Sequence, residues 1–207
     1  MMKLEEDLTI LKELKGRFGD EILNNYPFPS AYKPDIKNPK SILLGCDPSN
    51  RHSNTLKYVF AIESHKNIFN SSIERIKSQL NQIGLNLDNV YCQNLCKNYF
   101  QKETAKNKIW YQVAEYWIPY LKIELSRFHT DIPVLLTSEC LYKALRFNNS
   151  IYYKPIEFYE CKTSIPIPPD ENKLNRPLIP FYRHYKYSLG NYETYREKAR
   201  KIVNNIN

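Results

Sequence analysis

The stretch Gly45-Cys46-Asp47-Pro48 places a carboxylate directly after a short apolar run, 41–45. An apolar run of this length that stops at glycine and proline is typical of a buried strand followed by a turn. Aspartate before proline is commonly a turn former. Ligands of parallel α/β sheets bind beyond the carboxyl ends of the strands, so Asp47 is also a candidate catalytic residue.

Two further polar side chains follow strand-like runs, Asn94 in the run 88–95 and His184 in the run 177–184. Asn94 could instead satisfy a backbone group, and His184 could be a hydrogen-bonded, half-buried histidine. A carboxylate can orient water, an imidazole can donate to a departing base, and a carboxamide can bind an amide-like base edge. Together the three residues indicate cleavage of a bond to a heterocyclic base.

An enzyme of this kind also needs an aromatic side chain to stack on the extruded base. The segment 56–64 supplies Phe60 and Tyr58 between the first expected strand and its helix. Core packing is the alternative role for either ring.

Apolar spacing along the chain predicts helices that alternate with short buried strands. The expected helices are 4–18, 67–84, 109–121, 138–147 and 195–206, and the expected strands are 41–45, 88–95, 132–138 and 177–184. Gly16 and Gly19 are expected to end the first helix, and 151–176 is expected to be an irregular extended region with an edge strand and a Pro-rich loop.

This alternation predicts the α/β class, as a three-layer α/β/α sandwich around a central, mostly parallel four-stranded sheet. At 207 residues the chain is expected to form a single domain, 1–207. An N-terminal helix and a Pro-rich lead-in would occupy 1–40, and the α/β core would occupy 41–207.

The composition favours a polyanionic partner, since 30 Lys and Arg residues against 22 Asp and Glu residues give a net charge of +8. Ordinary solubility charge is the alternative. The charged N-terminus and the lack of a long apolar run predict a cytoplasmic protein rather than a membrane protein. The five cysteines are scattered and odd in number, so we expect reduced thiols and no zinc or iron–sulfur site.

The order of these pieces resembles the uracil-DNA glycosylase superfamily. The family has a first motif of the type G-Q-D-P-Y-H, an F-S aromatic segment, an asparagine that ends the next strand, and an H-P-S-type motif near the C-terminus. The corresponding segments here are GCDPSN (45–50), VFAIES (59–64), VYCQNLCKNYF (90–100) and PFYRHYKYSLGNY (180–192). The resemblance covers roughly residues 40 to 203, but the matching motifs are short.

The resemblance implies a DNA base glycosylase that needs no cofactor, with DNA as its partner. Separately, we expect the chain to be a monomer. Asp47 would orient the attacking water, and His184 would stabilise the leaving base. The base would be bound by Phe60, Asn94, Ser49 and Asn50. The residues expected to contact DNA are Arg51, Arg183, Lys186, Tyr185 and Tyr187, and further candidates for a basic face are Lys57, Lys97, Lys102 and Lys106.

Two departures from the family pattern leave alternatives open. Ser49 stands where the uracil-specific branch has a bulky tyrosine, so the base need not be uracil. His184 is followed by Tyr185, Lys186 and Tyr187, so the family's apolar wedge is not recognisable, and Tyr185 or Tyr187 could take its place. A non-catalytic nucleic-acid-binding relative and an enzyme acting on a small nucleoside or nucleotide therefore remain alternatives.

Overall fold

The computed structural model describes residues 2–48, 55–62 and 71–205. Its four strands form one sheet in the order β2-β1-β3-β4, and every neighbouring pair is parallel. The strands are β1 (Ser41–Gly45), β2 (Val90–Asn94), β3 (Val134–Leu136) and β4 (Leu178–Pro180). All their residues are buried, as expected for a parallel sheet that is covered on both faces. The predicted α/β class and the four-stranded sheet are confirmed.

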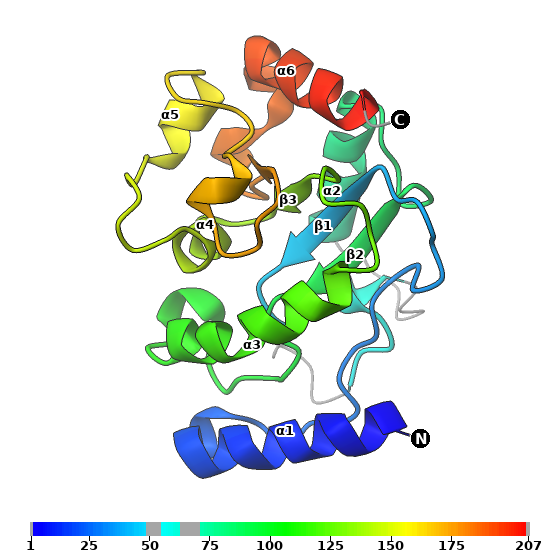
Figure 1. The fold of residues 1–207 in the computed structure, drawn as a ribbon, viewed down its shortest axis with the longest axis vertical. Coiled ribbons are helices and arrows are strands. Elements are labelled where there is room, and N and C mark those ends of the chain that lie inside the picture. Colours follow the sequence, from blue (N-terminus) through cyan, green and yellow to red (C-terminus); the bar gives the residue numbers. More distant parts are fainter. Residues whose placement is uncertain (1, 49–54, 63–70, 206–207) are drawn as a thin grey trace.

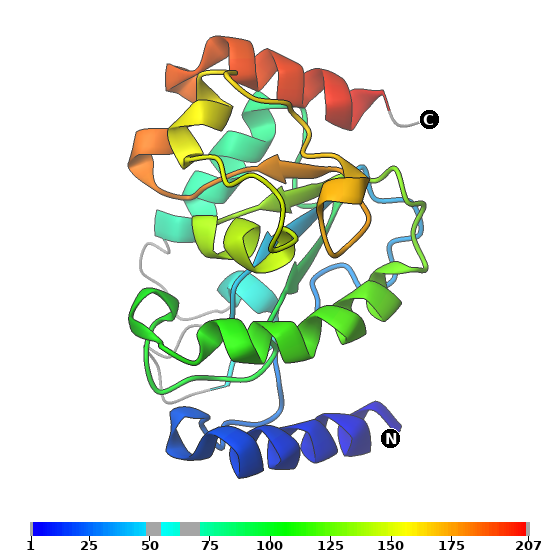
Figure 2. The ribbon, with the colours of Figure 1, turned by 60° about the vertical axis from the view of Figure 1, so that its left-hand side comes forward.

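Helices cover the sheet on both sides. In Figures 1 and 2, α2 and α6 lie on one side of the sheet and α3 lies on the other, with α1 beyond α3. The α-helices are α1 (Met2–Phe18), α2 (Ser71–Gln82), α3 (Trp110–Leu125), α4 (Glu139–Leu145), α5 (Pro155–Tyr159) and α6 (Glu193–Asn204). This arrangement gives the predicted three layers.

Three local predictions were wrong. Residues 155–159, expected to be extended, form the short helix α5, which starts at Pro155 and has its N-terminus capped by Glu157. Five residues are too few to show helical periodicity in the sequence. Gly16 lies inside α1 instead of ending it, and only Gly19, with φ of +59°, follows the helix end. In place of the expected edge strand, the region 151–176 has two isolated antiparallel bridges, between Ile167 and Leu178 and between Asn172 and Arg146.

The order of the strands fixes where a ligand can bind. From β1 the chain passes through α2 to β2 on one side, and after β2 it passes through α3 to β3 on the other side of β1. Where the connections of two adjacent parallel strands run in opposite directions, a crevice forms between the carboxyl ends of the strands. The crevice expected here lies between the ends of β1 and β3.

Backbone hydrogen bonds hold the segments after the strands in register at this edge. Gly45 lies opposite Asn94 in the sheet. Beyond the strands, Cys96 N donates to Cys46 O over 2.9 Å, and Arg183 N donates to Thr137 O over 3.1 Å. The residues that follow all four strands are therefore gathered along one edge. Within the described ranges, no helix is both long enough and apolar enough to cross a membrane.

Candidate active site at the carboxyl edge of the sheet

Asp47 is held two residues after β1 by hydrogen bonds from a distant part of the chain. Trp110 Nε1, in the first residue of α3, donates to Asp47 Oδ1 over 2.9 Å. The hydroxyl of Thr104, at the start of the 3-10 helix η3 (Thr104–Lys106), donates to the same oxygen. In the part of the chain that the structure describes, Asp47 Oδ2 accepts no hydrogen bond. Both hydrogen bonds therefore hold the same oxygen of the carboxylate, Oδ1.

Burial raises the pKa of Asp47 to about 6 from its ordinary value of 3.8. The hydrogen bonds from Thr104 and Trp110 and the positive charge of Arg183 lower this pKa, but by less than burial raises it. Asp47 is thus ionised near neutral pH and still basic enough to accept a proton from water. A carboxylate with these properties in a crevice is a functional-site candidate.

The side chains of Phe60 and Asn94 meet over Gly45. A methyl group placed on Gly45 would lie 2.3 Å from Asn94 Oδ1 and 2.8 Å from Phe60 Cζ, so the glycine is needed for both to approach. Phe60 lies in the 3-10 helix η2 (Val59–Ala61) with φ of +59° and ψ of 13°, which is costly for a residue with a side chain. The Phe60 ring is thus kept at the edge of the sheet at some expense in backbone strain.

Asn94 carries an unused hydrogen-bond donor. Asn94 is 2% exposed, and its Nδ2 has no hydrogen-bond partner among the residues that the structure describes. Most buried polar atoms in folded proteins are paired, because an unpaired one costs about 1 to 3 kcal/mol. The free amide group is accounted for if a ligand oxygen accepts its hydrogen.

A chain of interactions fixes the backbone of Asn94. Asn94 N donates to Gln93 Oε1 over 2.9 Å, and Gln93 Nε2 donates to Glu124 Oε1 over 2.6 Å. Lys97 pairs with Glu124 over 2.8 Å, and the Tyr91 hydroxyl donates to Glu124 as well. These partners lower the pKa of Glu124, although burial opposes them. Glu124 therefore stays ionised and holds Gln93 against Asn94.

His184 lies at the same edge, directly after Arg183, but it is exposed and does not bond to Asp47. His184 Nδ1 accepts a hydrogen bond from Lys186 N over 3.3 Å, and the Tyr185 ring packs beside the imidazole with centroids 4.4 Å apart. In a neutral imidazole whose Nδ1 accepts, the proton is on Nε2. His184 can therefore present an N–H donor to solvent or to a ligand.

The residues expected to contact DNA have different surroundings. Tyr185 is 65% exposed and Lys186 is exposed, whereas Tyr187 packs on Tyr159 with centroids 4.9 Å apart. Arg183 is half-buried, and its positive charge lowers the pKa values of Asp47 and Cys46. Three residues predicted to contact base or DNA lie outside the described residues, namely Ser49, Asn50 and Arg51.

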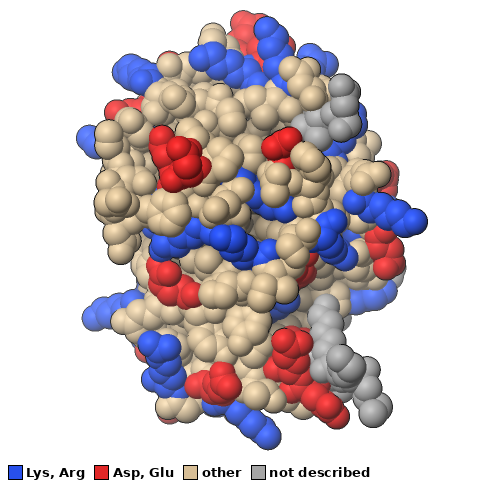
Figure 3. Space-filling model, in the orientation of Figure 1, with Lys and Arg blue, Asp and Glu red and all other residues tan. Residues whose placement is uncertain are grey.

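Among the other basic candidates, Lys97 is paired with Glu124, and Lys102 is paired with Glu21 over 2.7 Å. Lys57 and Lys106 are exposed. Figure 3 shows a band of Lys and Arg side chains across the middle of one face of the molecule, with acidic side chains on both sides of it. The positive charge is therefore interleaved with acidic groups on this face.

Sequence reasoning missed the partners that complete the site. Thr104, Trp110 and Glu124 come from segments far from Asp47 and Asn94, and no spacing in the sequence connects them. Cys46 Sγ and Ser138 Oγ, which lie 2.9 Å apart, join the ends of β1 and β3. Burial and the Asp47 charge raise the pKa of Cys46, so the thiol stays protonated and is a poor nucleophile.

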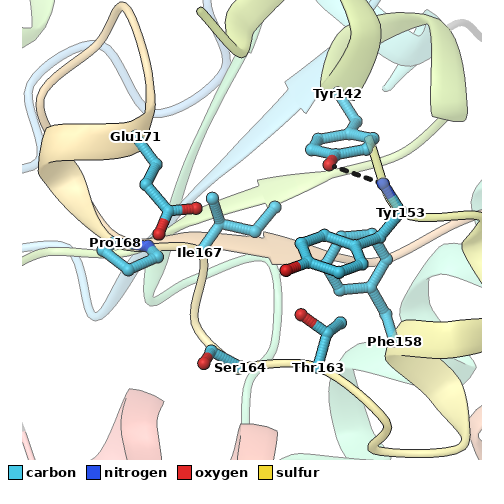
Figure 4. Close-up of a pocket in the computed structure, with 8 residues that line it drawn as sticks. All are labelled: Tyr142, Tyr153, Phe158, Thr163, Ser164, Ile167, Pro168 and Glu171. Atoms are coloured by element: carbon cyan, nitrogen blue, oxygen red, sulfur yellow. Dashed lines mark hydrogen bonds between the residues drawn. The ribbon is translucent and has the colours of Figure 1, made fainter. Parts of the chain in front are cut away.

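Two cavities lie away from Asp47. The smaller, of about 30 Å³, is bordered by Tyr142 of α4 and Phe158 of α5, and Figure 4 shows its lining. It has room for one or two water molecules and none for a base. Within the described residues, no three side chains of His, Cys, Asp or Glu are grouped as metal ligands would be.

No protein-family model matches this chain, and no curated protein matches its sequence. The motifs quoted above and the geometry at the sheet edge therefore carry the functional argument.

Proposed function

We propose that this protein is a DNA base glycosylase, which hydrolyses the bond between a base and its deoxyribose. The observation that carries the proposal is the meeting of the Phe60 ring and the Asn94 side chain over Gly45, where Asn94 also has an Nδ2 that pairs with none of the described residues. This pair offers a stacking surface and a polar group at the sheet edge that also holds Asp47. The resemblance of the motifs to the uracil-DNA glycosylase superfamily supports the same reading.

The chemistry follows from the groups present. A base extruded from its stack would lie against Phe60, and Asn94 Nδ2 would donate to a carbonyl oxygen on the base edge. Asp47 would orient a water molecule through Oδ2 and stabilise the positive charge that develops on the sugar. As the bond from C1′ to the base nitrogen breaks, the water oxygen bonds to C1′. The departing base takes the electron pair of the broken bond, and Asp47 accepts the proton of the water.

His184 would assist the departing base. Its Nε2–H can donate a hydrogen bond to the base while negative charge builds on it, which lowers the energy of the transition state. Tyr185 and the Lys186 backbone support the ring in the orientation that frees Nε2. The exposure of His184 is consistent with a ligand that covers it on binding.

We further propose that the protein binds DNA, is located in the cytoplasm and acts as a monomer. The net charge of +8 favours a polyanion, and the exposed Tyr185 and Lys186 flank His184 where a strand would pass. The identity of the base is left to experiment, because Ser49 replaces the tyrosine of the uracil-specific branch.

The test is base release from oligonucleotides that contain uracil, hypoxanthine, xanthine or a thymine mismatch, run beside the matching free deoxynucleosides. We expect release from one or more oligonucleotides, reduced about tenfold or more in His184→Ala. Release from free nucleosides alone would favour an enzyme of small nucleosides. Salt-sensitive DNA binding with no release from any substrate would favour a non-catalytic binding protein.

A further inference from the structure

A groove of about 420 Å³ lies on the Pro-rich lead-in, away from Asp47. We name it the Tyr32–Tyr58 groove; its lining consists of Tyr32, Lys33, Pro34, Asp35, Ile36 and Tyr58. This volume lies within the range of small-ligand sites and exceeds that of the cavity between α4 and α5. None of the chemistry proposed for Asp47 and His184 uses the groove.

Backbone hydrogen bonds connect the groove to the candidate active site. Ser30 N donates to Lys57 O over 2.9 Å, and Val59 N donates to Ser30 O over 3.0 Å, so the lead-in runs beside the segment that ends at Phe60. Tyr32 and Cys92 exchange backbone hydrogen bonds at the edge of β2. Since Cys92 precedes Asn94 by two residues, this anchor lies about 7 Å from Asn94 along the strand. The groove and Asn94 are therefore attached to the same strand, a few residues apart.

The groove combines aromatic rings with positive charge. The rings of Tyr32 and Tyr58 meet edge to face, with centroids 5.6 Å apart and planes at 86°. The ammonium group of Lys57 lies 4.7 Å from the centroid of the Tyr58 ring, and that of Lys33 lies 5.8 Å from the centroid of the Tyr32 ring. Aromatic rings beside cations are the groups that proteins use to bind bases and phosphates of single strands.

The charge of the surrounding segment also favours an anion. The lead-in segment 33–40 contains three lysines and one aspartate. Lys33 is paired with Asp88 over 2.9 Å, while Lys57 is exposed. Arg127 adds a further cation, since its Nη1 donates to Pro34 O over 2.8 Å. Lysine side chains are long and flexible, so Lys57 can turn from its ring to a phosphate at small cost.

We propose that the Tyr32–Tyr58 groove binds a nucleotide of single-stranded DNA, with the base against the tyrosine rings and the phosphate beside Lys57. The proposal rests on the proposed function, because it assigns the groove to a nucleotide that flanks the one at Phe60. It makes single-stranded DNA, or a locally opened duplex, the preferred substrate. A closed duplex keeps its bases stacked and cannot place one in the groove.

The test is binding of a labelled eight-nucleotide oligothymidylate to the full chain at several salt concentrations. We compare wild type with Lys57→Gln, which removes an exposed charge, and with Tyr58→Leu, which removes a ring. Lys201→Gln, also exposed but on α6, is the matched charge control. Loss of one phosphate contact should lower the slope of log affinity against log salt by about 0.7 in Lys57→Gln. Tyr58→Leu should weaken binding about fivefold to a hundredfold.

An unchanged salt slope in Lys57→Gln, or the same change in Lys201→Gln, overturns the proposal, as does equal affinity for a matched duplex. If the thermal melt shows that Tyr58→Leu fails to fold, the comparison of Lys57→Gln with Lys201→Gln still tests the proposal. The outcome is separable from the proposed function because binding is measured on an oligonucleotide of natural bases in the Asp47→Asn variant as well. If base release depends on Asp47 but Lys57→Gln binds with the wild-type salt slope, the glycosylase proposal stands and the proposal for the Tyr32–Tyr58 groove is wrong.

Discussion

Trp110 Nε1 donates a hydrogen bond to Asp47 Oδ1 over 2.9 Å, which ties the first residue of α3 to the carboxylate that follows β1. The bond holds one oxygen of the Asp47 carboxylate in place. It also opposes the rise in the pKa of Asp47 that burial causes. The hydroxyl of Thr104 acts in the same way.

The Thr104 hydroxyl should set the acidic limit of activity. The carboxylate form of Asp47 is the active one, so base release should fall as the pH drops through about 6. Thr104→Val removes a donor that favours the charged form, so the pKa should rise and the acidic limb should move to higher pH. The pH dependence of single-turnover release checks this. Thr104→Ser keeps the hydroxyl and should behave as wild type. An acidic limb at the wild-type pH in Thr104→Val would contradict the role of the Thr104 hydroxyl.

Asp47→Asn should make the protein more stable. The pKa of Asp47 is about 6 in the folded protein against an ordinary value of 3.8, so the folded state holds its proton more tightly than the unfolded state between these pH values. Wild-type stability should therefore fall relative to Asp47→Asn as the pH rises from about 4 to about 6, and the difference should stay constant above. We expect a gain of roughly 1 to 3 kcal/mol at pH 8. Denaturant unfolding at pH 4 and pH 8 measures it; equal gains at both would show that burial of the charge is not the cause.

Gly45→Ala should disrupt base binding. The added methyl group would lie 2.3 Å from Asn94 Oδ1 and 2.8 Å from Phe60 Cζ, so one or both side chains must move. Displacements of about 1 Å at a reacting site can cost up to a hundredfold in rate, and we expect a loss of about tenfold to a hundredfold. Gly16→Ala is the matched control, because it has open space around it in α1 and should add about 0.5 to 1 kcal/mol of stability. Full activity in Gly45→Ala would contradict the proposal that Phe60 and Asn94 bind the base.

Gln93→Met should weaken substrate binding through Asn94. The change leaves Asn94 N without its acceptor and Glu124 without one donor. We expect KM to rise about fivefold to fiftyfold, the cost of leaving a buried hydrogen-bond group without its partner, with a smaller effect on kcat. In a double-mutant cycle with Asn94→Ala, Gln93→Met should add little, because residues that act through one contact are not additive. Full additivity would make Gln93 a purely structural residue.

The sequence predicted the sheet better than it predicted the site. The runs 41–45 and 88–95 are short, apolar and bounded by turn residues, so β1 and β2 were visible, and Asp47 and Asn94 followed from their positions at strand ends. Thr104 and Trp110 could not be predicted, since they reach Asp47 only through the packing of α3 on the sheet. The helix α5 was hidden because a five-residue helix shows no period.

The left-handed backbone of Phe60 was equally invisible in the sequence. The sequence allowed either base stacking or core packing for Phe60, and only the structure shows the strained turn that brings its ring to Gly45. The orphan Nδ2 of Asn94 is also a property of packing. The proposed binding of a base rests on these two features and not on the motif residues alone.

The most direct test is the joint yield of free base and abasic site from a pool of single-stranded oligonucleotides carrying uracil, hypoxanthine or xanthine, with a thymine-mismatch duplex beside it. Wild type and Asp47→Asn are compared at pH 7.5. We predict equal amounts of free base and abasic site with wild type, and a loss of about a hundredfold or more in Asp47→Asn. DNA binding without free base in either protein, or release that Asp47→Asn leaves unchanged, would contradict a glycosylase that works through Asp47.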